Sequence, residues 1–167
     1  MDIFFITPFP DSIKTLIDNN IANQGVKKDL LVINIINPRD FAKDSYKKID
    51  DEPYGGGSGM VMMCEPFFAA IDYCISKSKN KPKIIFPSPK GKVLNHSISS
   101  ELSNEESIIF ICGHYKGLDQ RIIDKYVDLE VSIGDYIISN GELSSMIVFD
   151  SIIRLIPGVL NDLNSAM

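Results

Sequence analysis

The chain has 167 residues, of which 44% are hydrophobic and 23% charged. This length fits one domain that buries roughly two-thirds of its unfolded surface, and the composition is that of a globular protein rather than a disordered one. The sequence shows no basic segment beside Met1 and no uncharged apolar run of about 20 residues, so we expect neither a secretory signal nor a membrane span.

Charge is unevenly distributed along the chain. Residues 1–100 carry 13 basic and 11 acidic side chains, a net +2, whereas residues 101–167 carry 4 and 11, a net −7. The basic excess lies in a run of lysines between Lys77 and Lys92. Such a run is typical of a solvated turn, and the alternative is a basic patch that steers RNA. An overall charge of −5 does not indicate a DNA-binding protein.

The three cysteines, Cys64, Cys74 and Cys112, form no C-x-x-C pair, and the only histidines are His96 and His114. An odd number of cysteines in a protein of this size favours a reducing compartment, so we expect a cytoplasmic protein without disulfides. So few potential ligands also favour the absence of a zinc site, and we expect no metal.

Hydrophobic spacing predicts strands and helices that alternate along the chain. The predicted strands are 2–7, 30–37, 83–87, 107–112 and 127–133. The predicted helices begin at Asp11 or Ser12 and then cover 20–28 (broken or bent at Gly25), 60–76, 95–103, 118–126 and 141–156. This alternation predicts an α/β fold, a mostly parallel sheet with helices on both faces.

A long polar segment, 38–59, ends in a run of glycines at 55–57 and 59. The run is not a phosphate loop, because it follows no strand, lacks the Lys-Ser/Thr of a Walker motif and does not have the G-x-G-x-x-G spacing. Long irregular connections are often functional. We therefore weigh two interpretations, a flexible loop that contacts a substrate and a plain surface loop.

Three turns follow predicted buried strands, after Pro87, Cys112 and Ile133. Ligands of α/β sheets bind at the carboxyl ends of strands, so these turns are expected to line one pocket. They offer backbone groups and apolar side chains, but no nucleophile–base pair and no paired carboxylates. Such a pocket suits a neutral, flat, hydrogen-bonding group such as adenine, and hence a cofactor that contains a nucleoside.

Five segments, in this order, resemble one family: DEPYGGGSGM (51–60), CGHYKG (112–117), SIGDY (132–136), GEL (141–143) and RLIPGV (154–159). They are similar to the bacterial tRNA (guanine-N1)-methyltransferases of the knotted SPOUT superfamily, and the similarity covers essentially the whole chain. The resemblance implies an α/β sheet whose C-terminal part is threaded as a trefoil knot, a rare exception among folds. It also implies a homodimer that binds S-adenosyl-L-methionine and methylates N1 of the guanine 3′ of the anticodon in tRNA, position 37.

The resemblance implies site residues as well. The cofactor would be bound by Ser88, Pro89, Gly113, Tyr115, Gly117, Ile133, Gly134, Asp135, Tyr136, Ile137, Ile138 and Gly141. The substrate loop would be Asp50, Tyr54, Gly55, Gly56 and Gly57. Arg154 matches the family's arginine, which would stabilise the negative charge that develops on guanine O6 during the reaction.

The sequence departs from the family at a few places. Residues 1–160 match the knotted cofactor-binding domain, and 161–167 match the start of the linker to a C-terminal tRNA-binding domain, which we expect to be absent. The general-base aspartate is expected near Met167, and Asp162 comes too early for that role. Lys116 replaces a frequent glutamate, and a lysine cannot ligate a metal cation.

These departures leave alternatives to an active tRNA methyltransferase. One is a dimeric, knotted module that binds S-adenosylmethionine but is catalytically impaired, because the base and the tRNA-binding domain are missing. Another is an unrelated doubly wound nucleotide-binding protein, which the missing G-x-G-x-x-G motif disfavours.

Overall fold

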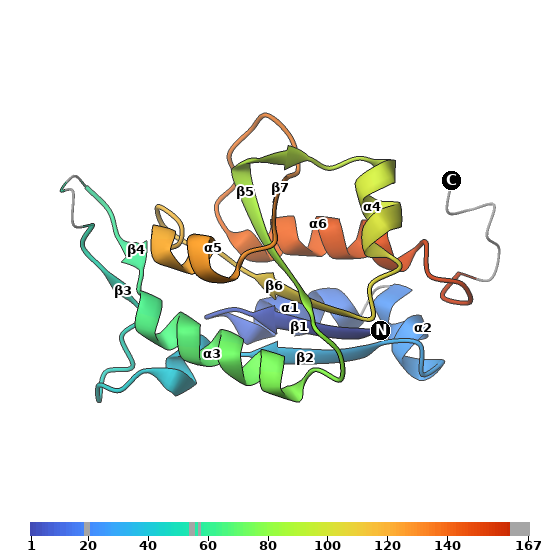
Figure 1. The fold of residues 1–167 in the computed structure, drawn as a ribbon, viewed down its shortest axis with the longest axis horizontal. Helices are drawn as coiled ribbons and strands as arrows, with labels where there is room; N and C mark the ends of the chain where they lie inside the picture. The colour runs from blue at the N-terminus through green and yellow to red at the C-terminus, as the bar shows by residue number, and fades with distance from the viewer. Residues whose placement is uncertain (19–20, 54–55, 57, 161–167) are drawn as a thin grey trace.

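A five-stranded sheet forms the centre of the computed structural model, which describes residues 1–18, 21–53, 56 and 58–160 (Figure 1). Its strand order is β2-β1-β6-β5-β7, and every neighbouring pair is parallel. The strands are β1 (Asp2–Ile6), β2 (Val32–Ile36), β5 (Lys83–Val93), β6 (Ser107–Ile111) and β7 (Leu129–Ser132). Two short antiparallel strands, β3 (Asp50–Asp51) and β4 (Val61–Met62), form a separate hairpin.

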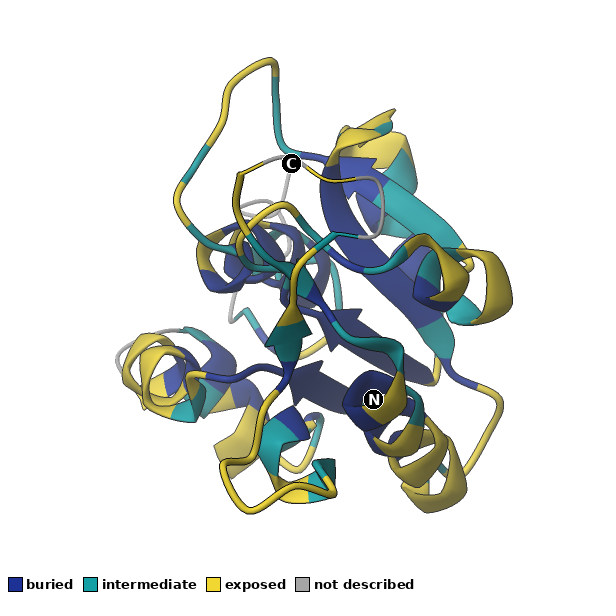
Figure 2. Ribbon diagram, turned by 90° about the vertical axis from the view of Figure 1, so that its left-hand side faces the viewer, coloured by how far each residue is buried: buried dark blue, intermediate teal, exposed yellow. Residues whose placement is uncertain are grey.

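Helices cover both faces of the sheet because its strands are apolar on both sides. In β1, Ile3 and Phe5 join one core cluster, while Phe4 and Ile6 join the other. The Phe5 face is covered by α1 (Pro10–Asp18), α2 (Ile21–Lys27), α4 (His96–Leu102) and α6 (Gly141–Ile153). The Phe4 face is covered by α3 (Cys64–Lys77), α5 (Gln120–Tyr126) and the 3-10 helix η1 (Pro38–Phe41). Figure 2 shows the buried strands between these two layers.

This architecture confirms the predicted α/β class with a mostly parallel sheet and helices on both faces. The trefoil knot stays a prediction. No helix in the described ranges is long and apolar enough to cross a membrane.

Strand β5 differs from its prediction, because it runs through the segment 88–91 that was expected to be a turn. It pairs with β7 on both sides of an irregularity between Pro87 and Lys92. An added Cβ on Gly91 would lie only 2.4 Å from the backbone of Glu130. The two backbones can approach this closely only because residue 91 has no side chain.

Two helix predictions are also corrected. The helix expected from Met60 begins only at Cys64, because residues 61–62 pair with β3. Helix α2 continues through Gly25 instead of breaking there. The Leu31 side chain lies where a Cβ of residue 25 would be, 2.6 Å away, so Gly25 serves close packing rather than a bend.

Candidate functional site

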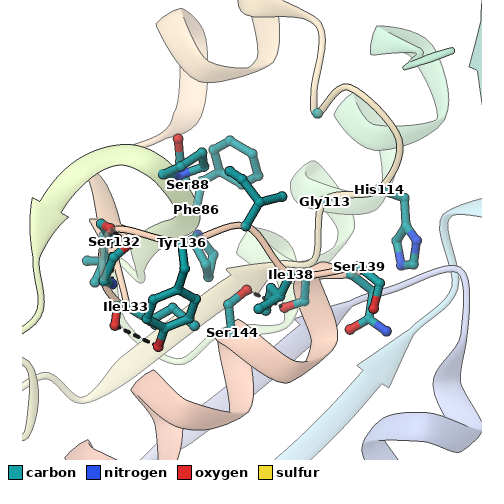
Figure 3. Close-up of a pocket in the computed structure, with 18 of the residues that line it drawn as sticks. Phe86, Ser88, Gly113, His114, Ser132, Ile133, Tyr136, Ile138, Ser139 and Ser144 are labelled. Atoms are coloured by element: carbon teal, nitrogen blue, oxygen red, sulfur yellow. Dashed lines mark hydrogen bonds between the residues drawn. The ribbon is translucent and has the colours of Figure 1, made fainter. Parts of the chain in front are cut away.

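A pocket of about 310 Å³ lies at the carboxyl ends of three neighbouring strands, β5, β6 and β7. Its walls are the three segments expected to meet there, the end of the apolar part of β5 and the turns after β6 and β7, closed by the first turn of α6 (Figure 3). The pocket therefore forms where parallel α/β sheets bind ligands.

The turn after β6 approaches the start of α6 very closely. The backbone N–H of Gly141 donates to the carbonyl of Gly113 at 2.8 Å. A Cβ on Gly141 would lie 2.3 Å from the Gly113 nitrogen, so no side chain fits between the two segments. Tyr115 has φ +58° and Gly117 has φ +106°, left-handed conformations that turn the chain around the pocket rim.

The turn after β7 is held by its own polar groups. The Tyr136 hydroxyl donates to the carbonyl of Ile133 at 3.0 Å, and the Ser132 hydroxyl donates to the carbonyl of Gly134 at 3.1 Å (Figure 3). Gly134 has φ +145°, and the Tyr136 ring packs over it, 2.4 Å from where a Cβ would be. At its far end, Asn140 caps α6 by accepting the N–H of Leu143. The loop is thus shaped by contacts within itself before any ligand binds.

Most of the residues named from the resemblance come together here. Eleven of the twelve expected cofactor-binding residues line the pocket: Ser88, Pro89, Gly113, Tyr115, Gly117, Ile133, Gly134, Tyr136, Ile137, Ile138 and Gly141. Asp135 is the exception, because it is exposed and does not line the pocket. Their role in binding a cofactor remains a prediction.

Other lining residues were missed by sequence reasoning, among them Phe86, Ser139, Asn140 and Ser144. Phe86 was predicted only as part of the strand 83–87, and its ring lies 2.8 Å from where a Cβ of Gly113 would be. Lys116, named only as a departure from the family, also lines the pocket. It is the one Lys, Arg, Asp or Glu among the described lining residues.

A buried polar cluster of Thr7, His114 and Glu142 lies beside the pocket and was also missed. Glu142 is 2% exposed, and its carboxylate contacts Nε2 of His114 at 2.7 and 2.9 Å. Burial raises the pKa of Glu142, but hydrogen bonds from His114 and Thr7 outweigh burial, so this pKa lies below its ordinary value. No sequence pattern joins three residues so far apart along the chain.

The expected substrate loop is only partly described. Asp50 lies in β3 and is half-buried, whereas Gly56 is exposed with φ +75°. Tyr54, Gly55 and Gly57 lie outside the described residues. Just after the loop, Met60 and Met62 exchange backbone hydrogen bonds with residues 116, 117 and 119, at 3.1 Å each. The segment that follows the expected substrate loop is therefore hydrogen-bonded to the pocket rim.

Arg154 does not lie at this pocket within one chain. It is the C-cap residue of α6, thirteen residues after Gly141, which corresponds to roughly 20 Å along a helix. It lines a second hollow, of about 650 Å³, together with His96 and Asp150. The structure does not bring Arg154 together with the expected cofactor-binding residues of its own chain.

The cysteines are not arranged as nucleophiles. Burial and a hydrogen bond with Asp119 raise the pKa of Cys64 to about 11, and burial raises the pKa of Cys74 to about 12. Burial also raises the pKa of Cys112 far above its ordinary value. These thiols are protonated at neutral pH and therefore weak nucleophiles. Among the described residues, no group of three or more His, Cys, Asp or Glu could hold a metal ion.

Comparison with known proteins identifies what this arrangement resembles. The family model described as "tRNA (Guanine-1)-methyltransferase TrmD" matches residues 1–167. A tRNA (guanine-N(1)-)-methyltransferase from Ruminiclostridium cellulolyticum is 46% identical over 156 residues, 93% of this chain and 67% of that protein. One from Methylacidiphilum infernorum is 44% identical over 167 residues, 100% of this chain and 72% of that protein.

A solved structure shares the fold. The crystal structure of tRNA (m1G37) methyltransferase from Aquifex aeolicus has a TM-score of 0.88 and 38% sequence identity. The match covers 97% of this chain and 72% of that one. The chain thus spans about two-thirds to three-quarters of the length of these three relatives.

Proposed function

The chain belongs to the tRNA (guanine-1)-methyltransferase family, and from this premise we propose that it methylates N1 of the guanine 3′ of the anticodon in tRNA, position 37. The proposed methyl donor is S-adenosyl-L-methionine. The relatives carry the names of enzymes, so the alternative of a catalytically impaired binding module is not favoured.

The observation that carries the proposal is the pocket at the ends of β5, β6 and β7. Its volume of about 310 Å³ is at the lower end of the range for small-molecule sites. Backbone N–H and C=O groups of the turns can pair with the edge of an adenine, while side chains such as Ile133 and Ile138 can cover its faces. Among the described residues, the lining fits the adenosine part of S-adenosylmethionine better than a polyphosphate, because Lys116 is its single fixed positive charge.

The chemistry needs positioning more than covalent help. S-adenosylmethionine, when bound, supplies an electrophilic methyl group on its sulfonium. Guanine N1 would accept this methyl group as the methyl–sulfur bond breaks, and the N1 proton would pass to a base. The residues of this chain have to hold the two reactants in line and keep water out. Arg154 would then stabilise the negative charge that develops on guanine O6.

We infer that the enzyme is a homodimer. Arg154 is roughly 15 Å along its own helix from Ser144, the last residue of α6 that lines the pocket, so it can serve a pocket only if a second chain brings it there. Helix α6 also exposes Leu143 (47%) and Ile147 (40%), one turn apart on the same side of the helix. A second copy that covers these side chains would account for both observations.

The domain assignment follows from the same premise. We infer that residues 1–160 form the cofactor-binding domain, that 161–167 begin a linker, and that Asp50 and the glycines after it contact the tRNA. A tRNA substrate also implies that the protein acts in the cytoplasm.

The direct test is methyl transfer to two tRNA transcripts that differ only at position 37. We expect radiolabelled methyl groups to be transferred to the G37 transcript and not to the A37 transcript. Reverse transcription should stop at position 37, since a methyl group on N1 blocks base pairing. Equal labelling of both transcripts, or a stop at another guanine, would refute the assigned substrate.

A further inference from the structure

The buried cluster of Thr7, His114 and Glu142 is not used by the chemistry proposed above. A carboxylate can only accept hydrogen bonds, so Nε2 of His114 carries a hydrogen and donates a hydrogen bond to Glu142. The Thr7 hydroxyl donates to Oε1 of the same carboxylate, the oxygen that lies 2.9 Å from His114 Nε2. Thr7 is fully buried, and the His114 side chain is only 12% exposed. The cluster is therefore largely removed from solvent, and its polar side chains hydrogen-bond to one another.

The three side chains come from three different parts of the site. Thr7 directly follows β1, Glu142 lies in the first turn of α6, and His114 belongs to the pocket turn after β6. Gly141, which precedes Glu142, donates a backbone hydrogen bond to Gly113, which precedes His114. The Phe9 ring packs on the His114 ring, with 4.8 Å between the ring centroids, and covers this side of the cluster. The Glu142 carboxylate of α6 thus hydrogen-bonds both to His114 of the pocket turn and to Thr7 at the end of β1.

The turn that His114 belongs to also carries the end of the substrate loop. The His114 backbone N–H points at the sulfur of Met62 at 3.2 Å, and the Met62 N–H donates to the carbonyl of Gly117 at 3.1 Å. A shift of His114 would therefore be passed to both the cofactor pocket and the substrate loop.

Burial of the Glu142 carboxylate costs free energy that an apolar side chain in the same place would not. A charged group removed from water destabilises a fold unless it is fully paired, and an apolar cluster of similar shape is often as stable. Among the described residues, His114 is the titratable group that acts on the Glu142 carboxylate, and the buried Cys112 thiol, whose pKa the Glu142 charge helps to raise, stays protonated. The charge is stabilised by hydrogen bonds from His114, from Thr7 and from the backbone N–H of Glu142 itself, so its stability depends on the geometry of these donors.

We infer that Glu142 is a positioning residue of the site: acting through His114, it fixes the 113–117 turn in the place where the cofactor pocket is complete. The inference rests on the proposed function, because S-adenosylmethionine is the probe that reports the state of the pocket. It assigns a role to the pair Glu142–His114 and to Thr7 that is distinct from contact with the reacting atoms.

The test is calorimetric titration of S-adenosylmethionine into the wild-type chain and a set of variants. Glu142→Gln keeps the shape but removes the charge, and His114→Leu removes the donor. Each should weaken cofactor binding by roughly tenfold, the effect of one unsatisfied buried polar group. The double variant should not lose a further tenfold in affinity beyond either single variant, because the two side chains act as a unit. His114→Gln, whose amide N–H can still reach the carboxylate, should restore most of the affinity.

A matched control separates positioning from a general loss of stability. Ser99→Ala removes a hydrogen bond of 3.0 Å to Ser151, which joins α4 to the same helix α6 far from this pocket. It should lower the melting temperature without changing cofactor affinity. Thr7→Val provides a second, isosteric probe of the cluster if Glu142→Gln does not fold. In the methyl transfer assay, the cluster variants should raise KM for S-adenosylmethionine more than they lower kcat.

The outcomes are distinguishable. If the variants fold and bind the cofactor as tightly as the wild type, the positioning role is refuted and the proposed function stands. The role is also refuted if affinity falls only in proportion to melting temperature, as judged against Ser99→Ala. If the folded wild-type chain itself does not bind S-adenosylmethionine, the proposed cofactor is refuted and the inference with it.

Discussion

Gly141 and Gly113 lie in contact through their backbones, and this contact sets the distance between two walls of the pocket. The Gly141 N–H donates to the Gly113 carbonyl at 2.8 Å, with no room for a side chain between them. Glycine at position 141 is therefore explained by close approach rather than by an unusual backbone angle.

We predict that Gly141→Ala weakens binding of S-adenosylmethionine by at least tenfold. Its Cβ would lie 2.3 Å from the Gly113 nitrogen, so the two segments would have to separate. Gly158→Ala is a suitable control, because it is strained at φ +89° but does not line the pocket. Titration calorimetry on both variants checks the prediction. Equal affinities for Gly141→Ala and wild type would show that this contact does not shape the site.

The Glu142 carboxyl predicts a pH dependence of stability. Its pKa is lowered in the folded chain, so its charge stabilises the fold at pH values above the pKa of the unfolded chain. This contribution is lost as the pH falls through the folded-state value. The difference in unfolding free energy between wild type and Glu142→Gln should therefore be largest at neutral pH and shrink towards pH 4 and below. Urea unfolding across this range measures it, and a difference independent of pH would contradict the assignment.

Strand β5 shows why an element could be predicted in part only. The apolar residues 84–87 of the segment KIIFP (83–87) indicated a strand, but Ser88-Pro89-Lys90-Gly91 has the composition of a turn. Tertiary pairing with β7 overrides this local preference, and a register shift absorbs the irregularity. Such pairing depends on contacts distant in the chain, which a local pattern does not contain.

We predict that Gly91→Ala destabilises the fold by about 2 kcal/mol or more, because a Cβ at this position would lie 2.4 Å from the backbone of Glu130. Lys90→Ala, at the exposed neighbouring position, should change stability by less than about 0.5 kcal/mol. Urea denaturation of both variants tests the prediction. If both variants unfold at the same urea concentration as the wild type, the β5–β7 pairing around Gly91 is not required for stability.

The site could be predicted where its residues belong to continuous motifs. CGHYKG and SIGDY each follow a buried strand, and the rule that ligands bind at strand ends brought them together correctly. Thr7 and Glu142 could not be found in this way, because 135 residues separate them and each alone is an ordinary polar residue. Arg154 was assigned a role from the motif RLIPGV, but a motif does not contain the distance between this residue and the pocket.

The arrangement of the whole molecule leads to a prediction about Arg154. If two chains share each active site, Arg154→Ala should abolish methyl transfer while it spares cofactor binding. Co-expression of this variant with Gly141→Ala should restore activity to about a quarter of the wild-type level. About half of the dimers would be mixed, and in each mixed dimer one of the two sites would combine an intact pocket with an intact arginine. The rate of methyl transfer by the mixed preparation provides the measurement. Activity no higher than that of either variant alone would mean that Arg154 does not act across the dimer.

The central claim is that the ends of β5, β6 and β7 form a binding site for S-adenosylmethionine. Calorimetric titration of this cofactor into the purified 167-residue chain tests the claim most directly. We predict saturable binding that Gly141→Ala weakens and Gly158→Ala does not. A folded chain that produces no binding heat at several temperatures, or affinity that is unaffected by Gly141→Ala, would contradict it.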